Sequence, residues 1–280
     1  MISKPESGKL LSIAIEAALC AGREILEVYY SNDFATKIKH DNTPLTLADQ
    51  RAHVVINDML NATGLPVLSE EGQKFDYEER RKWEYFWLVD PLDGTKEFIR
   101  RNGEFTVNIA LIHKQNPVIG VIYVPVLEDM YFASKVNGAY KLDCINYQSD
   151  KRSLPELISI SRRLPASGLK QAYTIVASRS HLTNETEDFI NLLKKEHSPV
   201  SLISKGSSLK ICLVAEGMAD IYSRFAPTME WDTAAGHAIA ESAGCTVTGE
   251  DGITPLIYNK QDLFNPWFII KAPGKPDEKF

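Results

Sequence analysis

Four short acidic segments of the sequence carry side chains suited to binding a hard cation. The densest is DPLDGT at residues 90–95, where two carboxylates follow the apolar run YFWLVD and precede the helical pattern KEFIRR. In α/β proteins, sites are commonly built where strands end, and the N–H groups that begin a helix can bind a phosphate. An ordinary capped turn also uses Pro, Asp and Gly in this order. The hexapeptide alone therefore does not distinguish a turn from a site.

The other three acidic segments have ordinary structural explanations when each is taken alone. Glu70 and Glu71 follow the strand-like run LPVL, Asp232 precedes a small-residue helix, and Asp49 lies at the polar entry to another helix. A solvated turn, an N-cap and a helix-start acid would account for them. Together, with no His or Cys beside them, the four segments supply the oxygen ligands that Mg²⁺ prefers. Asp90 could bridge two such ions, which lie about 3.5–4 Å apart in two-metal sites.

The elements that must position these residues follow from hydrophobic periodicity. An N-terminal amphipathic helix is predicted from apolar residues at helical spacing: Leu11, Ala14, Ala18, Ala21, Ile25 and Val28. A second helix is predicted over 48–64, a buried strand over 85–90 that stops at Pro91, and an antiparallel meander over 105–142. Further strands are predicted at 157–161, 174–178, 200–204, 220–225 and 267–272, alternating with helices at 184–196, 207–217 and 232–243.

This order predicts an α+β or α/β protein in two parts. Residues 1–150 form an α+β subdomain with the meander and most of the metal ligands, and residues 151–280 form an α/β subdomain. The polar stretch 143–157 is the expected joint.

Composition narrows the class of partner. The formal net charge of −6 and the pI of about 5.6 argue against binding a nucleic-acid polymer, which requires many Lys and Arg contacts to phosphates. The four cysteines lie far apart and form no metal or redox motif, so free thiols in a reducing cytosol are expected. No apolar run reaches the roughly 18 residues of a membrane span, so no transmembrane segment is expected. Oligomeric state cannot be predicted from these features.

The three segments EE, DPLDGT and WDTAAG, in this order and spacing, resemble those of the lithium-sensitive, magnesium-dependent phosphatase superfamily. That superfamily contains inositol monophosphatases, fructose bisphosphatases and bisphosphate nucleotidases, and its fold is a layered αβαβα sandwich. The resemblance covers nearly the whole chain. Within it, DPLDGTKEF, the segment SRSH at 178–181 and the stretch GSSLKICLVAEGMADIYSRF look like the bacterial 3′(2′),5′-bisphosphate nucleotidase branch, whereas inositol monophosphatases typically have Thr-Asn-Phe after DGT.

The resemblance implies roles by position. One Mg²⁺ would be held by Glu70, Asp90 and the Leu92 carbonyl, and a second by Asp90, Asp93 and Asp232, with two or three ions per site. Catalytic roles would fall to Asp49, Thr95 and Glu70, with the Thr95 hydroxyl and Asp49 orienting the attacking water. The substrate-binding set would comprise Glu70, Leu92, Asp93, Gly94, Thr95, Ser178, Arg179, His181, Ser207, Lys210, Arg224 and Asp232.

The reaction implied is hydrolysis of the 3′-phosphate of adenosine 3′,5′-bisphosphate to AMP and inorganic phosphate, by in-line attack of water. The sulfated nucleotide is a second candidate substrate, and the implied role is in sulfur assimilation. The resemblance also implies a cytoplasmic, lithium-sensitive enzyme, with peripheral attachment to the cytoplasmic face of the inner membrane in relatives.

Other functions stay open at this point. An inositol monophosphatase or a sugar bisphosphatase would share the same acidic segments. A non-enzymatic protein that binds metal for regulation is a further alternative, although the sequence lacks the EF-hand loop pattern and its acidic segments lie far apart. A nucleotide kinase is disfavoured because no G-x-x-x-x-G-K-[ST] segment is present.

Overall fold

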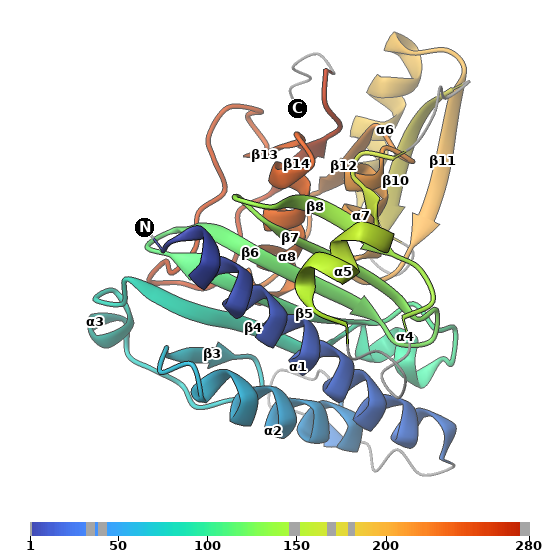
Figure 1. Ribbon diagram of the computed structural model, residues 1–280. Helices are drawn as coiled ribbons and strands as arrows, with labels where there is room; N and C mark the ends of the chain where they lie inside the picture. The colour runs from blue at the N-terminus through green and yellow to red at the C-terminus, as the bar shows by residue number, and fades with distance from the viewer. Residues whose placement is uncertain are drawn as a thin grey trace.

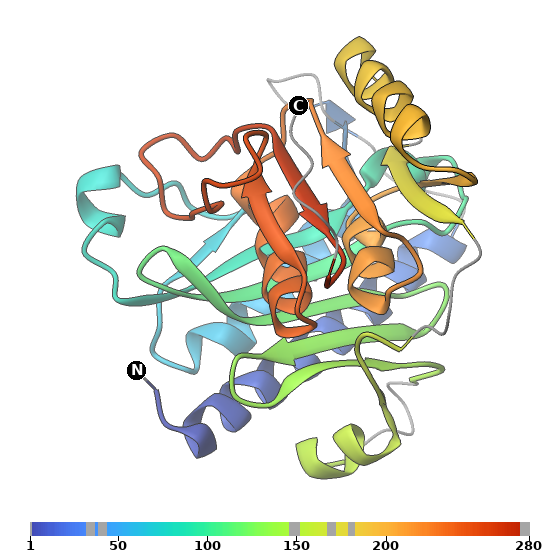
Figure 2. The same ribbon diagram turned by 90° about the horizontal axis from the view of Figure 1, so that it is seen from above.

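A computed structural model describes residues 2–31, 37–38, 44–145, 152–166, 172–178 and 183–274. Two large β-sheets and the helices around them form successive layers (Figures 1 and 2). Helices cover the outer face of each sheet, and two further helices lie between the sheets. The layered αβαβα sandwich that the family resemblance implies is therefore confirmed.

The larger sheet is mostly antiparallel and has the strand order β3-β4-β5-β6-β7-β8-β9. Its strands are β3 (Val67–Ser69), β4 (Tyr85–Asp93), β5 (Thr106–His113), β6 (Asn116–Val124), β7 (Asp129–Ser134), β8 (Gly138–Leu142) and β9 (Arg162–Arg163). Strand β3 runs parallel to β4, and each later neighbour is antiparallel. The short strands β1 (Lys37–Ile38) and β2 (Pro44–Leu45) pair separately. The helices that accompany this sheet in sequence are α1 (Lys4–Tyr30), α2 (Leu47–Asn61), α3 (Tyr77–Arg80), α4 (Thr95–Ile99) and α5 (Leu154–Ile160).

The smaller sheet has the strand order β11-β10-β12-β14-β13 and mixes parallel with antiparallel pairs. Its strands are β10 (Tyr173–Ser178), β11 (Val200–Lys205), β12 (Ile221–Arg224), β13 (Thr246–Gly249) and β14 (Phe268–Lys271). Helix α6 (Asn184–Glu196) packs Phe189, Ile190 and Leu193 on one face of this sheet. Helices α7 (Leu209–Glu216) and α8 (Glu230–Ser242) fill the space between the two sheets.

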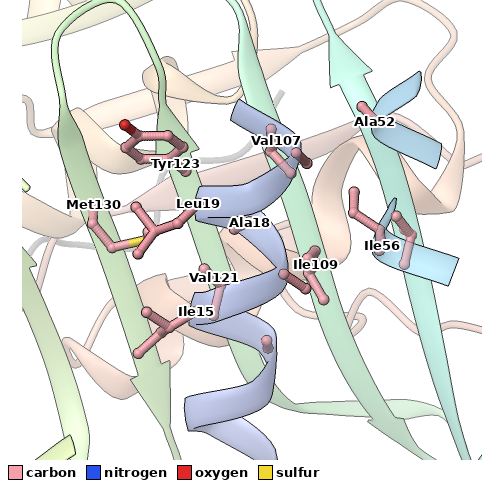
Figure 3. Packing of buried hydrophobic residues seen from close by; sticks show 14 of the residues in the cluster. Ile15, Ala18, Leu19, Ala52, Ile56, Val107, Ile109, Val121, Tyr123 and Met130 are labelled. Atoms are coloured by element: carbon pink, nitrogen blue, oxygen red, sulfur yellow. The ribbon is translucent and has the colours of Figure 1, made fainter. Parts of the chain in front are cut away.

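Apolar packing fixes the layers. Figure 3 shows Ile15 and Leu19 of α1 lying on Val121 and Met130 of the larger sheet, and these side chains are at most 5% exposed. The opposite face of that sheet receives α8 so closely that a Cβ on Gly120 would lie 2.2 Å from the Ala235 carbonyl oxygen. Only glycine permits this approach. Because α8 is seated directly on the sheet, its N-terminus is held at a fixed place relative to the end of β4.

Two local predictions were wrong. Residues 157–161 were expected to form a strand, but α5 occupies this stretch, since Ser153 N and Oγ both donate to Glu156 Oε2 at 2.7 and 2.6 Å in a capping box. Strand β4 does not stop at Pro91 but continues to Asp93, with a register shift between Asp90 and Asp93. Proline is tolerated in a sheet at such an irregularity.

Other expectations agree with the described residues. The two N-terminal helices, the meander, the other four strands and the three later helices lie within a few residues of their predicted positions. No disulfide joins the four cysteines, all of which fall in the described ranges. In the described part of the chain, no helix combines the length and apolarity that crossing a membrane requires. A division of the chain near residue 150 stays a prediction.

Candidate active site

The acidic segment DPLDG forms the irregular end of β4 and the turn that follows it. Asp90 lies opposite Asn108 on β5 and is 2% exposed. Its Oδ1 accepts a hydrogen bond from Leu92 N at 3.0 Å, which turns the chain sharply. Gly94 then adopts a φ of +92°, and a Cβ there would lie 3.2 Å from the Glu104 carbonyl oxygen. This turn presents two carboxylates and the first residues of α4 toward one pocket.

Glu70 reaches the same place through the parallel pairing of β3 with β4. Ser69 pairs with Val89, and Glu70 N donates to the Val89 carbonyl oxygen at 3.1 Å. Because the carboxyl ends of parallel strands meet at one edge of a sheet, Glu70 is brought beside Asp90. Glu70 directly follows the end of β3 as the sequence predicted, whereas Asp90 lies inside β4, which ends at Asp93.

Asp93 is held by donors from the other half of the molecule. Its Oδ2 accepts from Ser207 Oγ at 2.7 Å, from Ser208 N at 2.7 Å and from Ser208 Oγ at 2.9 Å. Asn108 Nδ2 lies 3.4 Å from the same oxygen. One oxygen of this carboxylate is thus committed to the N-terminus of α7, whose orphan N–H groups favour an acceptor there.

Asp232 enters from α8 as the third residue of that helix. Its Oδ2 accepts from Met229 N at 2.9 Å, so its carboxylate caps a backbone N–H group at the start of the helix. The helix start also carries Glu230, which is fully buried and accepts from Asn259 N, Lys260 N and Lys260 Nζ at 2.6, 3.0 and 2.5 Å. The first turn of α8 is therefore firmly attached, and Asp232 faces the end of β4 from the opposite side.

Burial and, after it, repulsion between carboxylates determine the electrostatics of this cluster. Burial raises the pKa of Asp90 well above its usual value, and the negative charges of Glu70, Asp93, Asp232 and Asp49 raise this pKa further. Burial likewise raises the pKa of Asp232, with Asp93 as the largest charged contributor. Buried like charges are costly unless a cation compensates them. The cluster therefore has the charge of a cation site.

The residues of the cluster are of the types that bind a divalent metal, but they do not form a complete coordination shell. Carboxylates and a backbone carbonyl are suitable ligands for Mg²⁺. Within the ranges that the structure describes, however, no three His, Cys, Asp or Glu side chains converge to the spacing of a complete cation site. Asp93 and Asp232 each have one oxygen bonded to a helix start, as described above. The residues therefore suit a site that keeps positions open for water and substrate.

Thr95 and Asp49 lie at the edge of the cluster. Thr95 Oγ1 is 3.3 Å from Asp49 Oδ1 and 3.4 Å from the Leu92 carbonyl oxygen. Asp49 is 3% exposed, and its Oδ2 accepts from Thr46 N and Thr46 Oγ1 at 2.7 and 2.5 Å. The capping of α2 thus fixes the Asp49 carboxylate while its second oxygen faces Thr95.

A cavity of about 270 Å³ joins this acidic cluster to two buried cations. The cavity is lined by Glu70, Asp90, Leu92, Asp93, Gly94, Thr95, Ser178, Ser207, Lys210, Arg224 and Asp232, among others. Lys210 is 6% exposed and Arg224 is 9% exposed. Burial lowers the pKa of Lys210 to about 8, against the opposing effect of Asp93. Among the described residues, Arg224 Nε is buried without a hydrogen-bond partner, which suits an anionic ligand.

Some of the residues singled out in the sequence are not among those that line the cavity. Arg179 and His181 lie outside the described residues. Glu71 follows Glu70 but does not line the cavity. Sequence reasoning did not identify Ser208, Tyr222 and Phe268 as lining residues. The doubled serine before a helical pattern was a usable signal for Ser208, since serine is a preferred N-cap.

Comparison with protein families gives a match over almost the whole chain. The profile of the inositol monophosphatase family matches residues 7–278. The 3′(2′),5′-bisphosphate nucleotidase CysQ of Escherichia coli strain K12 is 44% identical over 265 residues, which is 93% of this chain and 99% of that protein.

Solved structures give the same grouping. The crystal structure of CysQ from Bacteroides thetaiotaomicron, described as a bacterial member of the inositol monophosphatase family, superposes with a TM-score of 0.87 at 55% identity. The match covers 96% of this chain and 98% of that one. An inositol monophosphatase from Thermotoga maritima has a TM-score of 0.70 at 20% identity, covering 93% and 91% of the two chains, and this likeness shows the fold alone.

Proposed function

Since the chain belongs to the inositol monophosphatase family, we propose that it hydrolyses the 3′-phosphate of adenosine 3′,5′-bisphosphate to AMP and inorganic phosphate, using Mg²⁺. The proteins named CysQ that it resembles are 3′(2′),5′-bisphosphate nucleotidases. Enzymes of this family generally depend on a metal ion.

The observation that carries the proposal is the polarity of the cavity. Its acidic cluster includes Asp90 and Asp93, and it also contains the buried cations Lys210 and Arg224. A substrate with one phosphate at the metal ions and a second phosphate elsewhere would satisfy both groups. Inositol 1-phosphate has a single phosphate and would leave the two buried cations without an anion, which is unfavourable.

A sugar bisphosphate also has two phosphates and is the second candidate. The similarity to named nucleotidases favours the nucleotide, since the identity reaches 44% over 93% of this chain. The sulfated nucleotide carries the same 3′-phosphate and is a further candidate substrate.

Metal binding in this proposal uses the ligands that the sequence suggested. Glu70, Asp90 and the Leu92 carbonyl would hold one ion, and Asp93 and Asp232 would hold a second with Asp90 between them, with two or three ions in all. Bound Mg²⁺ supplies charge neutralisation at the phosphoryl oxygens and lowers the pKa of a bound water.

The chain's own groups orient the reaction. The backbone N–H groups of Gly94 and Thr95, at the start of α4, bind the phosphate to be removed. The Thr95 hydroxyl accepts a proton from the attacking water as it passes its own proton to Asp49 Oδ1, at 3.3 Å. The water oxygen bonds to phosphorus as the bond between phosphorus and the 3′ oxygen breaks, and the 3′ oxygen takes a proton from solvent water as AMP leaves. Lys210 and Arg224 hold the 5′-phosphate throughout.

Identification of the product tests this proposal. We expect adenosine 3′,5′-bisphosphate incubated with the protein and Mg²⁺ to yield 5′-AMP and one equivalent of phosphate, and chelation of Mg²⁺ to stop the release. Formation of 3′-AMP would show that the nucleotide binds in the opposite orientation. Turnover that persists in excess chelator would contradict the metal assignment. Cytoplasmic location, peripheral membrane attachment and the role in sulfur assimilation stay predictions.

A further inference from the structure

Ser208 lies where the two separate acidic segments of the site meet. It is the N-cap of α7 and is 3% exposed. Its backbone N donates to Asp93 Oδ2 at 2.7 Å, and its Oγ lies 2.9 Å from the same oxygen and 2.8 Å from the Asp232 carbonyl oxygen. One residue thus contacts the end of β4 and the start of α8 together.

A side chain of the larger sheet orients the hydroxyl of Ser208. Asn108 Nδ2, on β5, donates to Ser208 Oγ at 2.9 Å. Asn108 Oδ1 accepts from Thr106 Oγ1 at 2.8 Å, which fixes which end of the amide faces Ser208. With an Oγ lone pair engaged by Asn108, the single hydroxyl proton is shared between Asp93 Oδ2 and the Asp232 carbonyl oxygen, while Ser208 N donates to Asp93 Oδ2 by itself. Thr106, Asn108 and Ser208 are at most 3% exposed, and burial strengthens hydrogen bonds of this kind.

Asp93 and Asp232 both line the cavity, and Asp93 is the largest charged contributor that raises the pKa of Asp232, so the two carboxyl groups lie close enough to repel each other. Ser207 also donates to Asp93 Oδ2, at 2.7 Å. Among the hydrogen bonds of the described residues, only those of Ser208 join Asp93 to the backbone of Asp232. The hydrogen bonds from Ser207, Ser208 and Asn108 all end on Asp93 Oδ2, and none of them uses Asp93 Oδ1.

We propose that Ser208 is a positioning residue, which holds the Asp93 carboxylate and the first turn of α8 at the separation that a shared divalent cation requires. This inference rests on the metal role given above under the proposed function. Groups that orient metal ligands without touching the metal commonly change metal affinity by about 10- to 100-fold when they are removed. Ser208 would act in this way through its hydroxyl.

The test measures metal binding by the nucleotide-free protein, so it does not depend on turnover. Mn²⁺ is the probe because it takes the same oxygen ligands as Mg²⁺, and free Mn²⁺ is counted by electron paramagnetic resonance. We expect Ser208→Ala to weaken Mn²⁺ binding about tenfold. The half-saturating Mg²⁺ concentration for hydrolysis should rise by a similar factor while the KM for nucleotide stays close to that of the wild type.

Ser134→Ala is the matched control. Ser134 is a fully buried serine on β7, and its Oγ accepts from Asn137 N and Nδ2 at 3.1 and 2.9 Å, away from the cavity lining. Both variants should lower the melting temperature, but only Ser208→Ala should weaken Mn²⁺ binding. A purely structural role for Ser208 would lower the melting temperature alone.

A second variant covers the case in which Ser208→Ala does not fold. Asn108→Ala removes the donor that orients Ser208 Oγ and should weaken Mn²⁺ binding in the same direction by a smaller factor. Wild-type Mn²⁺ affinity in the folded variants would overturn the proposal. A wild-type protein that hydrolyses the nucleotide but binds no Mn²⁺ would overturn the positioning role while leaving the substrate assignment in place. A wild-type protein that binds Mn²⁺ but does not hydrolyse the nucleotide would overturn the substrate assignment while leaving the positioning role in place.

Discussion

Lys210→Met separates the recognition of a second phosphate from catalysis. Met keeps the length of the buried side chain and its packing near Tyr222, over whose ring Lys210 Nζ lies at 5.6 Å, but removes the charge. Hydrogen bonds to charged groups contribute about 1.5–3 kcal/mol. Since about 1.4 kcal/mol corresponds to a factor of ten, kcat/KM for adenosine 3′,5′-bisphosphate should fall by about 10- to 150-fold. The burial of Lys210 places the loss toward the upper part of this range.

The assay compares two substrates by phosphate release at pH 7. With 3′-AMP, which lacks the 5′-phosphate, Lys210→Met should change kcat/KM by less than about threefold. This substrate makes no contact between a 5′-phosphate and Lys210 that the substitution could remove. Lys194→Met, at an exposed lysine in the last turn of α6, is the control and should match the wild type with both substrates. Equal losses for both substrates in Lys210→Met would refute the assignment of Lys210 to the second phosphate.

The pH dependence gives an independent check on the same residue. Burial lowers the pKa of Lys210 to about 8, so the free enzyme loses this cation as the pH rises through 8. Because kcat/KM reports ionisations of the free enzyme, the preference for adenosine 3′,5′-bisphosphate over 3′-AMP should decline above pH 8 in the wild type. In Lys210→Met the preference should not vary over this range.

The remaining predictions concern the acidic cluster and its turn. Asp90→Asn should abolish phosphate release, yet the metal-free protein should melt at the same or a higher temperature, because the change removes a buried charge repelled by its neighbours. Thr95→Ala and Asp49→Asn should each lower kcat with little change in KM. Because the two residues act as a unit, kcat of the double variant should be close to that of either single variant. Fully additive losses would exclude Asp49 from proton transfer. Gly94→Ala should cost about 1–2 kcal/mol at its φ of +92° and lower the melting temperature by about 2–8 °C, and an unchanged melting temperature would show that the turn relaxes.

The acidic cluster could be predicted from the sequence because its residues carry their chemistry in short segments. Asp90 and Asp93 are two strand-end carboxylates before a helix, and a buried strand followed by such a turn is visible in one stretch of chain. Asp232 could be placed at a helix start for the same reason. That these segments meet came from a resemblance and not from their spacing.

The hydrogen bonds around Ser208 could not be predicted in this way. Ser208 meets Asp93 and Asn108 only after the helix α7 packs between the two sheets, and no local pattern encodes contacts between such distant segments. The residues 157–161 show a second limit. A short run of apolar and polar residues fits a strand or a helix, and the capping box at Ser153 decided the outcome.

The ratio of kcat/KM for adenosine 3′,5′-bisphosphate to that for inositol 1-phosphate, measured at saturating Mg²⁺, tests the central claim most directly. The cavity combines the acidic cluster with two buried cations, Lys210 and Arg224. We expect the ratio to exceed about 100, since a substrate without the second phosphate does not bring these two buried cations the phosphate that would bind them. A ratio near or below one would contradict the nucleotidase assignment and would indicate that the two cations do not select a second phosphate.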